Sequence, residues 1–114
     1  MKTSYFAING QHPDAVAICA TVPNFYKGKR YKKLAPTWGI FKEWKESGND
    51  TRYTERYIKE VLDKLDSAEV YADLGEDAIL ICYESSEKFC HRHIVAKWLK
   101  DELGIDIQEV SNGK

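Results

Sequence analysis

The residues best suited to chemistry lie in one short stretch, ILICYESSEKFCHRH, between Ile79 and His93. An apolar run ends in a polar loop, and the loop ends in a thiol, an imidazole and a guanidinium, at Cys90, His91 and Arg92. A helix that begins here would present unpaired backbone N–H groups, which attract anions and lower the pKa of a nearby thiol. The stretch therefore predicts a nucleophile at Cys90, a proton-transfer group at His91 and an anion-binding fork at Arg92.

Glu84, where the apolar run ends, is a third catalytic candidate, because a carboxylate there could orient an imidazole or act as a general base. The alternative for Glu84 is a solvated loop carboxylate. Cys90 also has a structural alternative: it shares one helical stripe with Ile94 and Trp98, and free cysteine is among the most buried residue types. Both interpretations of Cys90 stay open.

Four soft metal ligands also lie close together in this stretch, at Cys82, Cys90, His91 and His93. Zinc sites usually have closer cysteine pairs, and Cys82 lies inside the apolar run, where its side chain could face away from the helix. The chain has neither a glycine-rich phosphate loop nor a G-x-S-x-G elbow. We therefore predict no metal site and no cofactor, and we expect His93 to be solvated.

A second concentration of functional groups is the basic and aromatic segment FYKGKRYKK, residues 25–33, which contains no acidic residue. The candidate ligand-binding residues in it are Tyr26, Lys27, Lys29, Arg30, Lys32 and Lys33. Basic side chains among aromatic ones suit a nucleotide, or a phosphate backbone with stacked bases. The alternative is a lysine-rich solvated loop. If the preceding strand runs parallel to that of Cys82, the segment shares a rim with Cys90.

Four apolar runs of strand length predict the sheet, at residues 4–8, 15–22, 78–84 and 105–110. The first two are separated by too few residues for a helical crossover, so they pair antiparallel if they are neighbours. A parallel arrangement needs another strand between them. The continuous apolar run at 78–84 is typical of a strand covered on both faces.

Helical spacing of apolar residues predicts helices over 37–48, 49–66 and 89–103, the last ending at Gly104. Residues 24–36 are expected to form a long loop or a broken helical turn. The closing strand, helix and strand imply a parallel, right-handed unit with Cys90 at the junction. The predicted fold is α/β, with a mixed or mostly parallel sheet flanked by helices in a three-layer, Rossmann-like arrangement.

Composition limits the chain to ordinary globular classes. Its 114 residues, 43% hydrophobic and 31% charged, fit a single domain over residues 1–114. A net charge of -1 gives no long-range attraction to nucleic acid, so any such affinity requires a local patch. No apolar run suits a bilayer or a secretion signal, and three cysteines cannot all pair, so we expect a cytoplasmic protein with free thiols and no membrane partner.

Two sequence blocks resemble the family of bacterial, archaeal and phage proteins called domain of unknown function 488, DUF488. One block is a strand ending in Cys82-Tyr83-Glu84, a short loop, and Cys90-His91-Arg92 opening a helix. The other is Pro23, Tyr26-Lys27-Gly28 and Tyr31 to Pro36. The resemblance implies an α/β fold with a site shared between the two blocks, but it supplies no reaction.

The chain departs from the family pattern just before Pro23. Many relatives have a Ser-Arg pair there, whereas this chain reads Cys19-Ala20-Thr21-Val22. If that arginine helps relatives to bind an anion, Arg30 or Arg92 must replace it here.

Two functional hypotheses follow from the sequence. In the first, the site binds or acts on a phosphorylated ligand, a nucleotide or a nucleic acid, with Cys90 attacking, His91 exchanging a proton and Arg92 holding the anion. In the second, the chain is a non-enzymatic nucleic-acid or protein-binding module in which Cys90 is structural.

Overall fold

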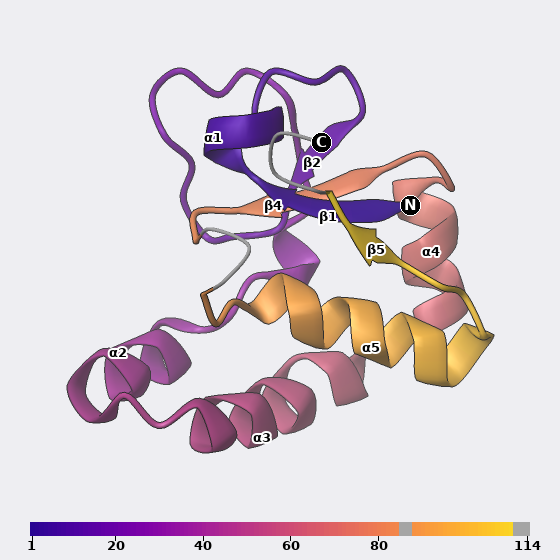
Figure 1. Ribbon diagram of the computed structural model, residues 1–114. Helices are drawn as coiled ribbons and strands as arrows, with labels where there is room; N and C mark the ends of the chain where they lie inside the picture. Colours follow the sequence, from indigo (N-terminus) through magenta and orange to yellow (C-terminus); the bar gives the residue numbers. More distant parts are fainter. Residues whose placement is uncertain (85–87, 111–114) are drawn as a thin grey trace.

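A five-stranded, all-parallel sheet forms the centre of the protein in a computed structural model that describes residues 1–84 and 88–110. The strand order is β3-β2-β4-β1-β5 (Figure 1). The strands are β1 (Lys2–Tyr5), β2 (Ala15–Ala17), β3 (Lys29–Arg30), β4 (Ile79–Cys82) and β5 (Gln108–Glu109). The predicted α/β class and mostly parallel sheet are confirmed.

The central strand β4 lies between β1 and β2, and all four of its residues are buried. The register pairs Tyr5 with Cys82 and Ala17 with Ile81, so these three strands end at one edge of the sheet. The interposed strand allows β1 and β2 to be parallel despite their short connection. It also explains the continuous apolar run at 78–84, because a strand covered on both faces needs no polar positions.

The first two strands are shorter than predicted, because the chain turns at the edge of the sheet. Residues expected to extend β1 form the helical turn α1 (Phe6–Asn9), which the hydrogen bond from Ser4 Oγ to Asn9 Oδ1 supports at 2.6 Å. The strand expected over 15–22 ends at Ala17. Beyond it, the Cys19 thiol donates to the Thr21 carbonyl at 2.9 Å, which bends the chain away from the sheet.

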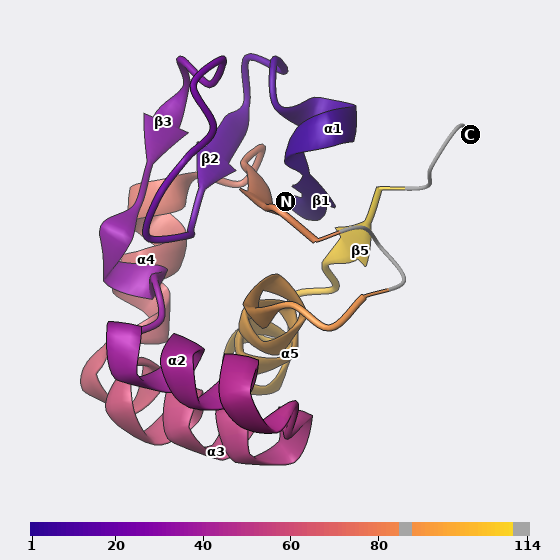
Figure 2. The same cartoon turned by 90° about the vertical axis from the view of Figure 1, so that its left-hand side faces the viewer.

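The longer helices lie on one face of the sheet, as Figures 1 and 2 show. They are α2 (Trp38–Ser47), α3 (Asp50–Glu60), α4 (Ser67–Leu74) and α5 (His91–Leu103). Their buried side chains form one core cluster with residues of β2 and β4. A second cluster on the opposite face joins Phe6 of α1 and Tyr26 to the strands. A short turn and a loop thus provide the third layer.

Capping residues set the helix boundaries. Thr37 accepts the Ile40 N–H at the start of α2, and Asn49 accepts the Arg52 N–H at the start of α3. Gly48 and Gly104 end α2 and α5 with φ values of 64° and 72°, in the left-handed region that favours glycine. Among the described helices, none is long and apolar enough to cross a membrane.

Two segments differ from what the sequence predicts. The helix predicted over 49–66 ends at Glu60 and continues as a 3-10 turn, Leu62–Lys64, which buries both Val61 and Leu62. Residues 67–74, to which no structure was assigned, form α4. The segment 24–36, expected to form a long loop or a broken helical turn, does contain a short helical turn, the 3-10 turn Lys32–Leu34, and in addition the two-residue strand β3.

A buried ion pair fastens the start of α5 to the edge of the sheet. The Arg92 guanidinium is fully buried and donates twice to Glu109 of β5, from Nε at 3.1 Å and from Nη2 at 2.9 Å. The Thr3 hydroxyl of β1 donates to the same carboxylate at 2.5 Å, and the guanidinium lies 5.7 Å from the Tyr5 ring centre. Bidentate pairing of this kind fixes geometry as well as charge.

Removing the carboxylate should destabilise the fold, because it leaves a buried cation without compensation. We expect Glu109→Ala to lower the free energy of unfolding by about 3 kcal/mol, measured by urea denaturation. The matched control is Asp101→Ala, which breaks the exposed Lys97–Asp101 pair and should cost less than about 1 kcal/mol. Equal losses in the two variants would show that the Arg92 pair contributes no more than a surface pair.

Candidate functional site

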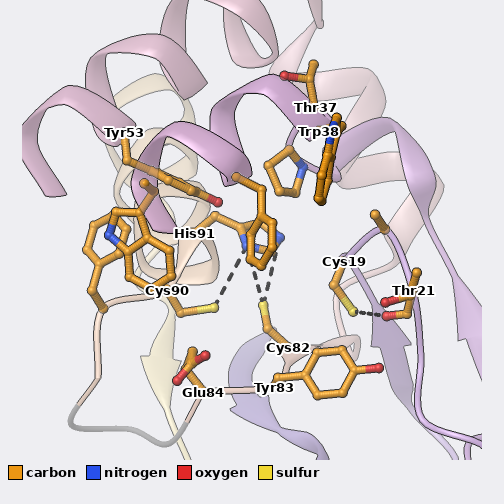
Figure 3. A pocket seen from close by; sticks show the side chains of 15 residues that line it. Cys19, Thr21, Thr37, Trp38, Tyr53, Cys82, Tyr83, Glu84, Cys90 and His91 are labelled. Carbon is orange, nitrogen blue, oxygen red and sulfur yellow. Dashed lines mark hydrogen bonds between the residues drawn. The ribbon is translucent and has the colours of Figure 1, made fainter. Parts of the chain in front are cut away.

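A pocket of about 280 Å³ opens at the carboxyl edge of the sheet, bounded by α2, α3 and the start of α5. All three cysteines of the chain line it, although they come from different segments (Figure 3). Cys19 follows β2, Cys82 ends β4, and Cys90 directly precedes α5. The position agrees with the general rule that ligands bind beyond the carboxyl ends of parallel strands.

Cys82, Cys90 and His91 form the floor of the pocket. Their side-chain sulfur and nitrogen atoms all lie within 4.8 Å of one another, and all three residues are buried. The Sγ atom of Cys90 lies 3.8 Å from Nδ1 of His91, and Cys82 Sγ lies 3.8 Å from both ring nitrogens. The thiol of Cys90 thus lies in contact with the imidazole of His91.

The protonation of the neutral His91 ring is set by a backbone carbonyl. Nε2 lies 2.7 Å from the carbonyl oxygen of Ile18, the residue after β2. Because a carbonyl can only accept, Nε2 carries the proton and Nδ1 presents its lone pair to Cys90. The buried Tyr57 ring packs edge-on against the imidazole, with ring centres 5.5 Å apart, and limits its rotation.

The two floor cysteines titrate in opposite directions. Hydrogen bonds from Cys82 and from His91 hold the pKa of Cys90 well below its usual value, in spite of the opposing effect of burial. Burial, with the hydrogen bond to Cys90, raises the pKa of Cys82 well above that of a free thiol. Cys90 is therefore the thiol of the pair that loses its proton first, to Nδ1 of His91, and Cys82 stays a neutral thiol that can donate to the resulting thiolate. Burial also raises the pKa of Cys19, to about 11.

The same three donors are a candidate set for a soft metal ion, and their geometry tests it. Cys82 Sγ is equidistant from the two ring nitrogens, so it lies beside the ring edge between them or over the ring face. If Cys82 Sγ and Nδ1 bound the same ion, the sulfur would lie nearer to Nδ1 than to Nε2. Nε2 is already hydrogen-bonded to the Ile18 carbonyl. The arrangement therefore fits a thiol, a thiolate and an imidazole better than a preformed three-ligand centre.

A continuous series of aromatic rings forms one wall of the pocket. Ring centres are 5.9 Å apart between Trp38 and Phe41, 6.4 Å between Phe41 and Trp44, 5.7 Å between Trp44 and Phe89, and 5.0 Å between Phe89 and Tyr53. Trp38, at the rim, is 71% exposed, whereas Tyr53 is buried. Such a wall offers flat apolar surface to a planar ligand.

The predicted catalytic residue Glu84 lies at the pocket, on the edge opposite the helices (Figure 3). It is exposed and does not orient His91, because the Ile18 carbonyl does so instead. The neighbouring loop residues 85–87 lie outside the described residues.

Arg92 does not line the pocket. Its guanidinium lies with Glu109, as described above, so the structure separates it from Cys90 and His91. His93 is half-buried with its Nε2 atom enclosed, and burial lowers its pKa, so the expectation of a solvated His93 is wrong.

The basic segment is not brought into the pocket either. None of the six residues predicted to bind a ligand is among its described lining residues. Tyr26 is buried, and its hydroxyl donates to the carbonyl of Lys29 and lies 3.2 Å from the carbonyl oxygen of Ala15. Because β3 runs parallel to β2, the chain returns to the opposite edge before Lys29. Arg30 contacts the pocket lining from outside, donating at 3.0 Å to the carbonyl of Ala20.

Three parts of the site were missed by sequence reasoning. The Ile18 carbonyl has no signal in the sequence, since any residue carries one. Cys19 was noted only as a departure from the family pattern. The three-residue spacing of Trp38, Phe41 and Trp44 is typical of the apolar face of a helix, so it does not reveal that all three rings line the pocket.

Comparison with known protein families identifies the family of this chain. The chain matches the family model DUF488-N3a, described as the active DUF488-N3 subclade, over residues 13–103. This range includes Ile18, Cys82, Cys90 and His91. No curated protein and no solved structure matches the chain.

The pKa directions predict a reactivity order for the three cysteines. Iodoacetamide should label Cys90 at neutral pH, and its rate should fall as the pH drops through a pKa below that of a free thiol. Cys19 and Cys82 should label much more slowly, because burial keeps them protonated. Peptide mass spectrometry between pH 5 and pH 9 measures each rate; labelling of Cys90 only after denaturation would contradict the thiolate.

Proposed function

We propose a function for this chain, which belongs to the DUF488 family: it is an enzyme that uses Cys90 as a covalent nucleophile. The observation that carries the proposal is the contact of Cys90 Sγ with Nδ1 of His91 while Nε2 is held by Ile18. A nucleophile next to a base that is itself oriented by a third group is the usual arrangement in covalent catalysis. The family's description as an active subclade supports an enzyme.

The geometry supports the following sequence of steps. The Cys90 proton moves to Nδ1, and the thiolate forms a bond to an electrophilic carbon of the ligand. Nδ1 then returns the proton to the leaving group as its bond to that carbon breaks. Water attacks the Cys90 adduct with Nδ1 as the base, which releases the product and restores the thiol. Throughout, the Nε2 hydrogen bond to Ile18 keeps the imidazole aligned.

Negative charge that develops on the ligand would be stabilised by backbone groups. The N–H of Arg92 is placed to interact with Cys90, which directly precedes α5, and the N-terminal end of a helix favours negative charge. The Arg92 side chain, predicted to hold an anion, is committed to Glu109. We assign anion stabilisation to the helix backbone. Glu84 remains a proposed general base for a ligand at the rim.

A nucleotide or a nucleic acid is the proposed ligand class, with its base in the pocket. The aromatic wall suits base stacking, which is worth about 1–3 kcal/mol per base in single-strand binding proteins. No lysine or arginine is among the described lining residues, so the phosphates would lie outside, where Arg30 borders the rim at Ala20. Lys29 and Lys32 are the exposed cations nearest to Arg30 in the sequence.

The competing function is a binding module with a structural Cys90. Binding of a nucleotide or nucleic acid that survives Cys90→Ala and falls when Lys29, Arg30 and Lys32 are substituted would favour it. We also propose that the chain acts as a single domain in the cytoplasm, since its three cysteines are free thiols, as is usual in a reducing compartment.

Removing the imidazole should raise the pKa of Cys90 and slow its reaction. We expect His91→Ala to reduce the iodoacetamide labelling rate of Cys90 at pH 7 by at least about tenfold, since one pKa unit corresponds to about 1.4 kcal/mol. The matched control is His93→Ala, in the same helical turn but outside the pocket lining, which should leave the rate unchanged. Circular dichroism verifies folding, and an unchanged rate in folded His91→Ala would refute the pairing.

Removing the exposed ring at the rim should weaken ligand binding. We expect Trp38→Ala to reduce affinity for adenosine monophosphate by at least about fivefold, about 1 kcal/mol of lost stacking, measured by calorimetry. Phe25→Ala is the control, because Phe25 is also exposed but lies outside this pocket. Equal effects of the two substitutions, or none from Trp38→Ala, would count against a base in the pocket.

A further inference from the structure

We propose that Cys90 and Cys82 act together as a redox-active dithiol that reduces small, uncharged, planar disulfides. This activity goes beyond the proposed function, because it requires the second cysteine and a sulfur electrophile. It starts from the observation that the pocket floor places a second thiol, that of Cys82, beside Cys90 and the His91 ring, with the donor atoms of all three residues within 4.8 Å of one another.

The two sulfur atoms are close enough for a bond to form after local side-chain movement. Both belong to a group of donor atoms that all lie within 4.8 Å of one another, and a disulfide requires about 2.05 Å. Cys82 is the last residue of β4 and Cys90 the residue before α5, so neither lies inside a helix. Rotation of the side chains can supply most of the approach.

The two thiols have complementary roles in exchange. Cys90 contacts His91 Nδ1, which removes its proton, whereas Cys82 remains protonated because of burial. The Cys90 thiolate attacks one sulfur of the disulfide, forming a mixed disulfide, and the first leaving thiolate takes the proton from Nδ1 and departs as a thiol. Cys82 then attacks Cys90 Sγ as its own proton passes to the freed Nδ1, forming the Cys82–Cys90 disulfide, and Nδ1 gives that proton to the second leaving group, which departs as a thiol. The substrate gains the two electrons that the dithiol loses, and an external low-molecular-weight thiol restores the reduced form.

The pocket walls specify the kind of disulfide. The aromatic series from Trp38 to Tyr53 favours a flat apolar group. No lysine or arginine is among the described lining residues, and Glu84 lies at the rim, which disfavours an anionic reagent. A neutral aromatic disulfide therefore fits better than a charged one.

Cys19 provides an internal control for this proposal. It lines the same pocket, but its thiol donates to the Thr21 carbonyl at 2.9 Å and it is not part of the donor group on the floor. If any thiol in the pocket could react with the disulfide, Cys19 would react too. The proposed dithiol mechanism leaves Cys19 unchanged.

The test uses 2,2′-dithiodipyridine, a neutral planar disulfide, on the full chain after treatment with a chelator. Wild-type protein should release two molecules of pyridine-2-thione per chain and lose the mass of two hydrogens. Peptide mapping should then show a Cys82–Cys90 disulfide and a free Cys19. Cys82→Ser should release one molecule and retain a pyridylthio group on Cys90, while Cys19→Ser should behave as wild type.

Several outcomes would overturn the proposal. They are a wild-type protein that stops at the Cys90 adduct, a disulfide that includes Cys19, and no reaction at Cys90. If Cys82→Ser fails to fold, the wild-type mass and peptide map decide the matter alone. Iodoacetamide labelling separates the two proposals. Rapid labelling of Cys90 without formation of a Cys82–Cys90 disulfide would refute the dithiol activity alone. An unreactive Cys90 would refute both the dithiol activity and the proposed nucleophile.

Discussion

The hydrogen bond from His91 Nε2 to the Ile18 carbonyl connects the sheet to the chemistry of the pocket. It joins the residue after β2 to the start of α5, the helix that follows the neighbouring strand β4. A buried imidazole needs a partner for its N–H, and the partner it has fixes which nitrogen faces Cys90. Without that bond the ring could present either nitrogen to the sulfur atoms, and the base at Cys90 would be undefined.

The Ile18 carbonyl is accessible because β2 is short. Ladder pairing of β2 with β4 extends to Ala17 and Ile81, and the Ile18 N–H still donates to the Ile81 carbonyl. Its carbonyl is then directed toward the helix layer. A longer β2, as the apolar run 15–22 suggested, would have occupied this carbonyl in the sheet. The Ile18 carbonyl can therefore bind His91 only because β2 ends at Ala17.

Features that depend on local sequence were predictable, whereas those that depend on distant partners were not. The apolar run of β4, the spacing in α5 and the signal at Gly104 identified the junction that contains Cys90 and His91. Asp66 followed by Glu69 marked the start of α4, but only Val70 of that helix is buried, so its apolar pattern was weak. The partners of His91 and Arg92, Ile18 and Glu109, are far away in the sequence, and no local pattern identifies them.

His91 and Arg92, which are adjacent in the first turn of α5, have different structural roles. Successive residues of a helix point about 100° apart, so neighbours in sequence face different surroundings. His91 faces the pocket and the Ile18 carbonyl, while Arg92 faces β1 and β5 and pairs with Glu109. One side of the turn anchors the helix to the sheet, and the other positions the imidazole against Cys90. The arginine thus supports the site by holding the helix N-terminus in place, and its charge is balanced before a ligand arrives.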